Sequence, residues 1–154
     1  MSLKQLGCFQ TVKTQTENGE LLSLQKMERF TVKIMDADLK QEIARVNNNV
    51  NLSLFGTGLR KQRVTIVENK IIITADHKRI PALAALDQSD RMSARLADVA
   101  ILDEYKRRLK EEFINQLKLP VICVLKDYAP DYELAVTFIL LKDDSLKSLD
   151  RKAT

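Results

Sequence analysis

Basic side chains at two separated positions of the sequence are the residues best suited to binding chemistry. Two runs of β-branched residues, 64–67 and 71–74, flank the short polar segment 68–70, and this pattern predicts a β-hairpin. The start of the first strand and the end of the second would then lie side by side. We therefore expect one positive patch made of Arg60, Lys61, Arg63, His77, Lys78 and Arg79.

Such a patch could hold a small anion. Arginine side chains bind carboxylate, bicarbonate or phosphate through charge-assisted hydrogen bonds, and the loop amides between Gly56 and Gly58 could add donors. Two alternatives stay open. Arg63 could pair with Asp76 across the hairpin so that nothing binds, or the basic residues could form a solvated rim.

Catalysis has little support in the sequence. His77 is the one histidine of the chain, and it follows Asp76 directly, so in an extended strand the two side chains point to opposite faces. A lone histidine at a strand end is more often structural than catalytic. The sequence has no Gly-x-Ser-x-Gly elbow, no P-loop and no metal-ligand cluster. We expect a protein that is not an enzyme and that needs no cofactor or metal.

Nucleic-acid binding is the alternative from a different class. The basic segment and a calculated pI near 9.1 allow contact with phosphates. Aromatic residues make up only 5% of the chain, and none lies within the basic hairpin, so no stacking platform is evident.

The composition is that of an ordinary globular domain. The chain has 154 residues and a net charge of +4, and residues 56–79 alone account for this excess with six Lys/Arg against two acidic residues. No apolar signal-peptide core or membrane-spanning run is present, which predicts a cytoplasmic protein. Two cysteines, Cys8 and Cys123, form no disulfide framework, and we expect Cys123 to be a small buried hydrophobe.

The elements around the hairpin follow from hydrophobic periodicity. We expect helices over 38–52, 80–86 and 91–118, and strands over 121–125 and 134–141. The long helix would bury a stripe of apolar residues that runs from Met92 to Leu117. Residues 1–35 form an N-terminal extension in which 10–16, 21–24 and 30–34 are weak strand candidates, 36–142 form the main domain, and 143–154 form a charged tail.

The predicted fold class is α+β. The order helix, hairpin, short and long helix, hairpin suits a four-stranded antiparallel sheet with helices on one face and extra N-terminal strands. The second face would still carry apolar residues, namely Val67, Ile72, Ile122, Val124 and Ile139. Because symmetric dimers are the commonest oligomers, we expect a homodimer that covers this face, unless the N-terminal strands do so.

Four features occur in order along the last two thirds of the chain. They are Gly56-Thr57-Gly58 after an amphipathic helix, a basic entry to an apolar hairpin, a short helical turn with Pro81, and a long charged helix before a strand–turn–strand. Together they resemble the MpsC-like family, named for the soluble component of a sodium-translocating, membrane-potential-generating system. The resemblance implies a non-enzymatic accessory protein that partners a membrane ion or inorganic-carbon transport system.

Overall fold

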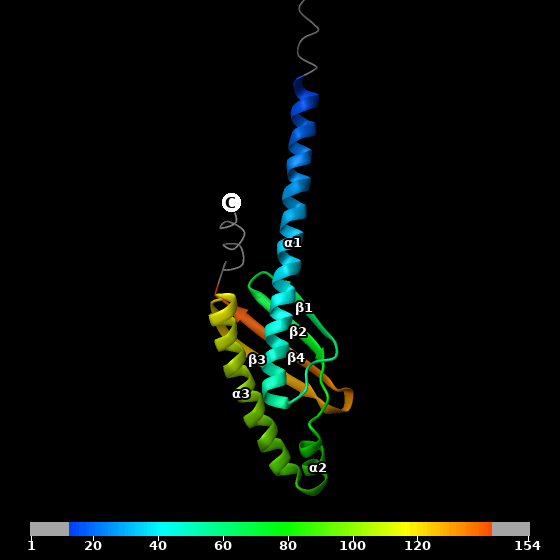
Figure 1. The fold of residues 1–154 in the computed structure, drawn as a ribbon, viewed down its shortest axis with the longest axis vertical. Coiled ribbons are helices and arrows are strands. Elements are labelled where there is room, and N and C mark those ends of the chain that lie inside the picture. Colours follow the sequence, from blue (N-terminus) through cyan, green and yellow to red (C-terminus); the bar gives the residue numbers. More distant parts are fainter. Residues whose placement is uncertain (1–12, 143–154) are drawn as a thin grey trace, which may run out of the picture. The chain divides into compact units, whose positions relative to one another are not determined.

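The computed structural model describes residues 13–142 and shows an α+β fold (Figure 1). Its elements are α1 (Lys13–Phe55), β1 (Gln62–Val67), β2 (Lys70–Asp76), α2 (Pro81–Ser89), α3 (Arg91–Leu117), β3 (Val121–Ala129), the short 3-10 helix η1 (Pro130–Tyr132) and β4 (Leu134–Leu141). The chain divides into two compact units, residues 1–38 and 39–154. The second unit contains the sheet.

The sheet is formed by two hairpins joined edge to edge. Its four strands are all antiparallel, in the order β1-β2-β4-β3. Val67 pairs with Lys70, so the first hairpin turns through two residues, and Glu68 adopts a left-handed backbone conformation with φ of 54°. The predicted fold class is therefore confirmed.

The hydrophobic core lies on one face of this sheet. In Figure 1, α3 and the part of α1 from residue 39 onward cross that face. Inward side chains alternate along the strands, and each fully buried one contributes about 1.5–3 kcal/mol. The core is made of Ile71, Ile73, Val121, Val124, Ile139 and Leu141 from the sheet, Ile43, Val46 and Val50 from α1, Tyr105, Leu109 and Phe113 from α3, and Leu119.

The prediction for the second face was partly wrong. Val124 and Ile139 are 8% and 0% exposed and face the helices. Ile139 faces inward by the regular alternation of β4. For Val124 the cause is a bulge in β3, where Val121 pairs with Leu141 and Cys123 already pairs with Leu140. The extra residue, Ile122, shifts the alternation by one, so Val124 joins the core and Cys123 lies on the opposite face, only partly buried.

Helix α3 begins where it was predicted but buries less of its apolar stripe. The Asp90 carboxylate accepts hydrogen bonds from the amides of Met92 and Ser93, both at 3.1 Å, which makes it the N-cap. The stripe is buried from Tyr105 onward. Its first part, with Met92, Leu96 and Val99, is 57–69% exposed.

The strands predicted near the N-terminus are not formed where the structure describes them, because α1 is one helix from Lys13 onward. Residues 20–29 are rich in Leu, Gln, Lys, Glu and Met, which are strong helix formers, and one glycine in a helix costs only about 1 kcal/mol. Parts of the predictions that fall on residues 1–12 and on the tail 143–154 lie outside the described residues.

Within residues 13–142, no helix combines the length and the apolar character that crossing a bilayer requires.

Candidate functional site

The two ends of the predicted hairpin meet. Gln62 pairs with Ala75, and the amide of Asp76 donates to the carbonyl of Lys61 at 2.9 Å. The backbone juxtaposition on which the anion site was based is therefore present.

The basic side chains nevertheless do not form one patch. Arg60 makes an exposed ion pair with Glu133, with Nη2 and Oε2 2.6 Å apart. Arg63 lies on the sheet face away from the helices, opposite Thr74 in the register. Asp76 is on the same face two residues further along β2, but no ion pair joins it to Arg63. Lys61 and Lys78 are exposed.

The two glycines of the loop have local structural roles. Gly56 ends α1 with φ of 69° while its amide donates to Leu52 at 3.0 Å, a conformation that favours glycine. A Cβ on Gly58 would lie 2.9 Å from Oδ1 of Asn48, the atom that accepts a hydrogen bond from the Leu59 amide.

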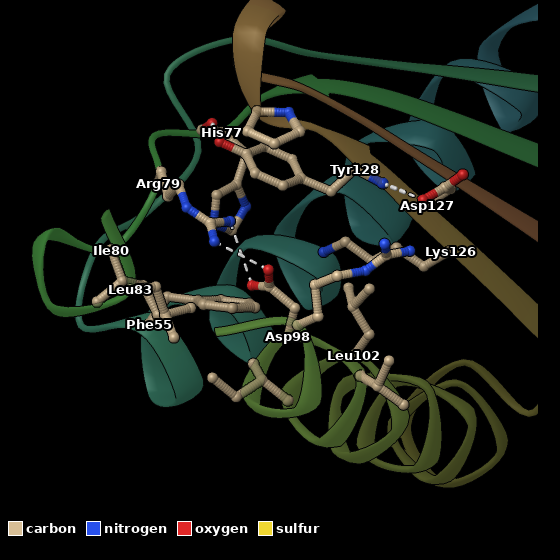
Figure 2. Close-up of a pocket in the computed structure, with 14 residues that line it drawn as sticks. Phe55, His77, Arg79, Ile80, Leu83, Asp98, Leu102, Lys126, Asp127 and Tyr128 are labelled. Carbon is tan, nitrogen blue, oxygen red and sulfur yellow. Dashed lines mark hydrogen bonds and ion pairs between the residues drawn. The ribbon is translucent and has the colours of Figure 1, made fainter. Parts of the chain in front are cut away.

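His77 and Arg79 turn inward and line a cavity of about 210 Å³ between the sheet, α2 and α3 (Figure 2). His77 continues the inward alternation of Ile71, Ile73 and Ala75 on β2, which explains why it is buried with only 7% exposure. The other lining residues are Phe55, Ile80, Leu83, Arg95, Asp98, Val99, Ile101, Leu102, Lys126, Asp127, Tyr128 and Pro130.

Arg79 is held by two carboxylates. Its Nη1 and Nη2 donate to Asp98 on α3 at 3.2 and 2.9 Å, as the dashed lines of Figure 2 show. Its Nε lies 2.7 Å from Oδ2 of Asp87 on α2, in an ion pair without the alignment of a hydrogen bond. Burial opposes the charged form, but the two carboxylates outweigh it and raise the pKa of Arg79. Arg79 therefore links α2 to α3 and is already neutralised.

Lys126 is the buried cation of the cavity, and among the described residues no carboxylate pairs with it, whereas Arg95, which also lines the cavity, is exposed. Lys126 is only 9% exposed, and its Nζ lies 3.4 Å from the ring centroid of Tyr105 and 5.3 Å from that of Phe55. Its one hydrogen bond goes to Oδ1 of Asn51 at 3.3 Å, although an ammonium has three donors. Burial lowers the pKa of Lys126 from 10.5 to about 7.

A buried polar network supports Lys126 from behind. Asn47 and Asn51 are 1% and 0% exposed on α1, and Asn51 donates to the Asn47 carbonyl at 2.8 Å. The Tyr105 hydroxyl donates to Oδ1 of Asn47 and lies 3.3 Å from the Thr137 hydroxyl. Burial raises the pKa of Tyr105 to about 12, so this phenol stays protonated at neutral pH.

His77 is neutral at neutral pH. Burial, followed by the charge of Lys126, lowers its pKa from 6.5 to about 4. The ring packs edge-on against Phe55, with centroids 4.5 Å apart, and Nδ1 has no hydrogen-bond partner.

The titratable side chains of the cavity are not paired with one another as a general acid and base. In the described part of the chain no carboxylate accepts a hydrogen bond from His77, and Asp98 is paired with Arg79. Among the described residues, no three metal-ligating side chains of the His, Cys, Asp or Glu type gather at one place. What the cavity offers is an apolar surface with a buried amine and a buried imidazole.

The sequence carried a signal for part of the residues that were missed. Asn47 and Asn51 recur at spacing four within the same helical face as Ile43 and Val50, where the pattern requires apolar residues. Lys126 shares the inward face of Val124, but the bulge at Ile122 sets that face and the sequence does not reveal it.

Comparison of the chain with protein-family models, with curated proteins and with solved structures finds no match. The functional conclusion therefore has to come from the cavity.

Proposed function

We propose that this is a non-enzymatic binding protein whose cavity takes a small organic anion with an apolar body and a carboxylate head. The observation that carries the proposal is Lys126, a buried amine at the cavity wall that has one weak acceptor and no ion-pair partner among the described residues.

The argument from charge concerns the cost of burying an unpaired cation. Removing an ammonium from water costs several kcal/mol unless a counter-charge and hydrogen bonds compensate. Arg79 in the same cavity has two carboxylates, whereas Lys126 has an amide oxygen and two ring faces. A ligand carboxylate next to Lys126 would supply the missing counter-charge.

The argument from shape concerns the body of the ligand. Seven of the lining residues are apolar: Phe55, Ile80, Leu83, Val99, Ile101, Leu102 and Pro130. At about 210 Å³ the cavity is smaller than the roughly 300–1,000 Å³ of pockets for drug-sized molecules. A short-chain or monocyclic carboxylic acid fits this size and lining, whereas bicarbonate or phosphate would gain nothing from the apolar walls.

The accessory role implied by the MpsC-like resemblance belongs to the same proposal. In that role the cavity is the sensing element, and binding of the anion would change the interaction of the protein with a membrane ion or inorganic-carbon transport system. Nucleic-acid binding has no comparable observation in its favour, because the three arginines do not form one basic surface. Arg60 is paired with Glu133, Arg63 lies on the open sheet face, and Arg79 points into the cavity.

The test is a ligand series measured by thermal denaturation at pH 6.5, followed by calorimetric titration of the best ligand. Acetate, butanoate, hexanoate and benzoate form the series, with bicarbonate, phosphate and a short single-stranded DNA as comparators. A ligand that binds only the native state raises the melting temperature by mass action. We expect the increase to grow from acetate to hexanoate.

Two further results are required. Binding should be lost in Lys126→Met and kept in Lys78→Met, the matched control at an exposed lysine. Affinity should fall by up to about tenfold per pH unit above pH 7, because the free amine must take up a proton to pair with a carboxylate. Equal responses to phosphate and hexanoate, no response to any carboxylate, or unchanged binding in Lys126→Met would each refute the proposal.

A further inference from the structure

The sheet face that points away from the helices is apolar and, within residues 39–142, is not covered by another element. Leu125, Val67 and Val136 are 58%, 49% and 38% exposed there. We call this surface the outer face. Its apolar residues are Val67, Ile72, Cys123, Leu125, Leu134, Val136, Phe138 and Leu140.

The strand register arranges the outer face in rows that cross all four strands. One row is apolar apart from one threonine and reads Thr65, Ile72, Phe138, Leu125 from β1 to β3. The neighbouring row reads Arg63, Thr74, Val136, Asp127. The first of these rows is the apolar centre of the outer face, and the second ends in opposite charges at the two edges. Lys70 and Asp76 lie on the same face at the two ends of β2.

Arg63 and Asp127 are too far apart to pair within one chain. They lie at opposite edges of the sheet, three strand spacings or about 14 Å from each other. Both are exposed, and Oδ1 of Asp127 accepts a hydrogen bond from the Tyr128 amide at 2.8 Å. Figure 2 shows the Asp127 carboxylate on the side of β3 that is turned away from Asp98 and Phe55. Each charge is thus available to a second molecule that presents the opposite charge at the same position along the strand direction.

A second copy of the chain presents that charge. A two-fold axis parallel to the strands, between β2 and β4, places β1 of one copy over β3 of the other. Rotation about this axis does not change the position of a row along the strand direction, so each row faces the same row of the other copy. Arg63 then faces Asp127 of the other copy twice, and Ile72 faces Phe138. An axis across the strands would place β1 over β1 and β3 over β3, so that Arg63 and Asp127 of the two copies would not meet.

We infer that the protein forms a face-to-face homodimer through the outer face, with its two-fold axis parallel to the strands. The inference is independent of the cavity, which lies on the opposite face of the sheet. Sheets packed face to face stand about 10 Å apart and bury one row against another, as in a β-sandwich.

The size of the outer face predicts a dimer of moderate affinity. Four strands of about seven residues give a face of about 19 by 23 Å. Two such faces present about 900 Å² in projection, and their accessible area is larger, close to the roughly 1,200 Å² at the lower end of specific interfaces. Dissociation is therefore expected within the micromolar range.

The first test is sedimentation equilibrium of the full chain from about 1 to 300 μM. We expect a monomer–dimer equilibrium for the wild type and a monomer at all concentrations for Leu125→Lys. The matched control is Leu52→Lys, which is also an exposed leucine (49%) but lies on α1 across the sheet, and it should dimerise like the wild type. A monomeric wild type, or a Leu125→Lys variant that still dimerises, would overturn the inference. The second result would place the contact elsewhere, for example in residues 1–38.

The second test fixes the orientation. Arg63→Asp and Asp127→Arg should each weaken the dimer by roughly tenfold, since each creates two like-charge contacts. The double variant should return to within about threefold of the wild type, because it restores both pairs with the signs exchanged. Since the two residues cannot meet within one chain, rescue supports the proposed axis, and additive losses in the double variant would overturn it.

Discussion

Replacing Lys126 by Met should stabilise the protein at acidic pH, and the gain should shrink as the pH rises. The pKa of Lys126 is about 7 in the folded state against 10.5 for an ordinary lysine. Below pH 7 this difference corresponds to about 5 kcal/mol of stability lost to the buried charge.

The sign of the pH dependence follows from proton binding. Between pH 7 and 10.5 the unfolded lysine is protonated and the folded one is not, so wild-type stability rises with pH over this window. Urea unfolding of wild type and Lys126→Met at pH 6, 7, 8 and 9 measures the difference. We expect about 5 kcal/mol in favour of Met at pH 6 and about 2 kcal/mol at pH 9, where the unfolded lysine still binds a proton that the folded one has released.

The control is Lys78→Met, which removes an exposed lysine and should leave the pH dependence of the wild type unchanged. A Lys126→Met variant that is less stable than the wild type at pH 6, or whose difference is the same at every pH, would refute the reasoning. Either result would mean that Lys126 is hydrated or already paired in the folded protein.

Two more residues of the cavity and its supporting network give separate predictions. The pKa of His77 is about 4 in the folded state and 6.5 in the unfolded chain, so the unfolded state binds the proton first as the pH falls. The unfolding free energy of the wild type should therefore decrease by about 3 kcal/mol between pH 6.5 and 4, and that of His77→Leu should not show this decrease. Parallel unfolding free energies of the two proteins over this range would contradict the prediction. Tyr105→Phe keeps the ring next to Lys126 but removes the hydroxyl that donates to Asn47. It should lower the unfolding free energy by about 1–3 kcal/mol at pH 7, measured from the urea midpoint. An unchanged midpoint would show that the network adds no stability.

The parts of the fold that could be predicted are those in which one local signal dominates. The β-branched runs on both sides of residues 68–70 specify the first hairpin, and Asp90 and Leu119-Pro120 bound the long helix. The N-terminal strands were mispredicted because the helix formers of residues 20–29 favour a continuous helix. The faces of β3 could not be derived from an apolar run, since a bulge at Ile122 leaves no trace in such a run.

The candidate site could be predicted only in its position along the backbone. The hairpin pairing brings residue 61 to residue 76, but the direction of each side chain depends on its place in the strand alternation. His77 falls on the inward side and Arg63 on the outward side. Lys126 is distant in sequence from both ends of the hairpin, and only the folded sheet brings it into the same cavity as His77.

The buried asparagines of α1 also determine which of several packings the core can adopt. An apolar helix face can slide along a sheet by one turn, about 5.4 Å, at little cost in burial. Here Asn47 donates to Gln62 of β1 at 3.0 Å and accepts from Tyr105 of α3, so such a slide would leave buried amide and phenol groups without partners. The network thus excludes shifted arrangements of helix on sheet and selects one axial register.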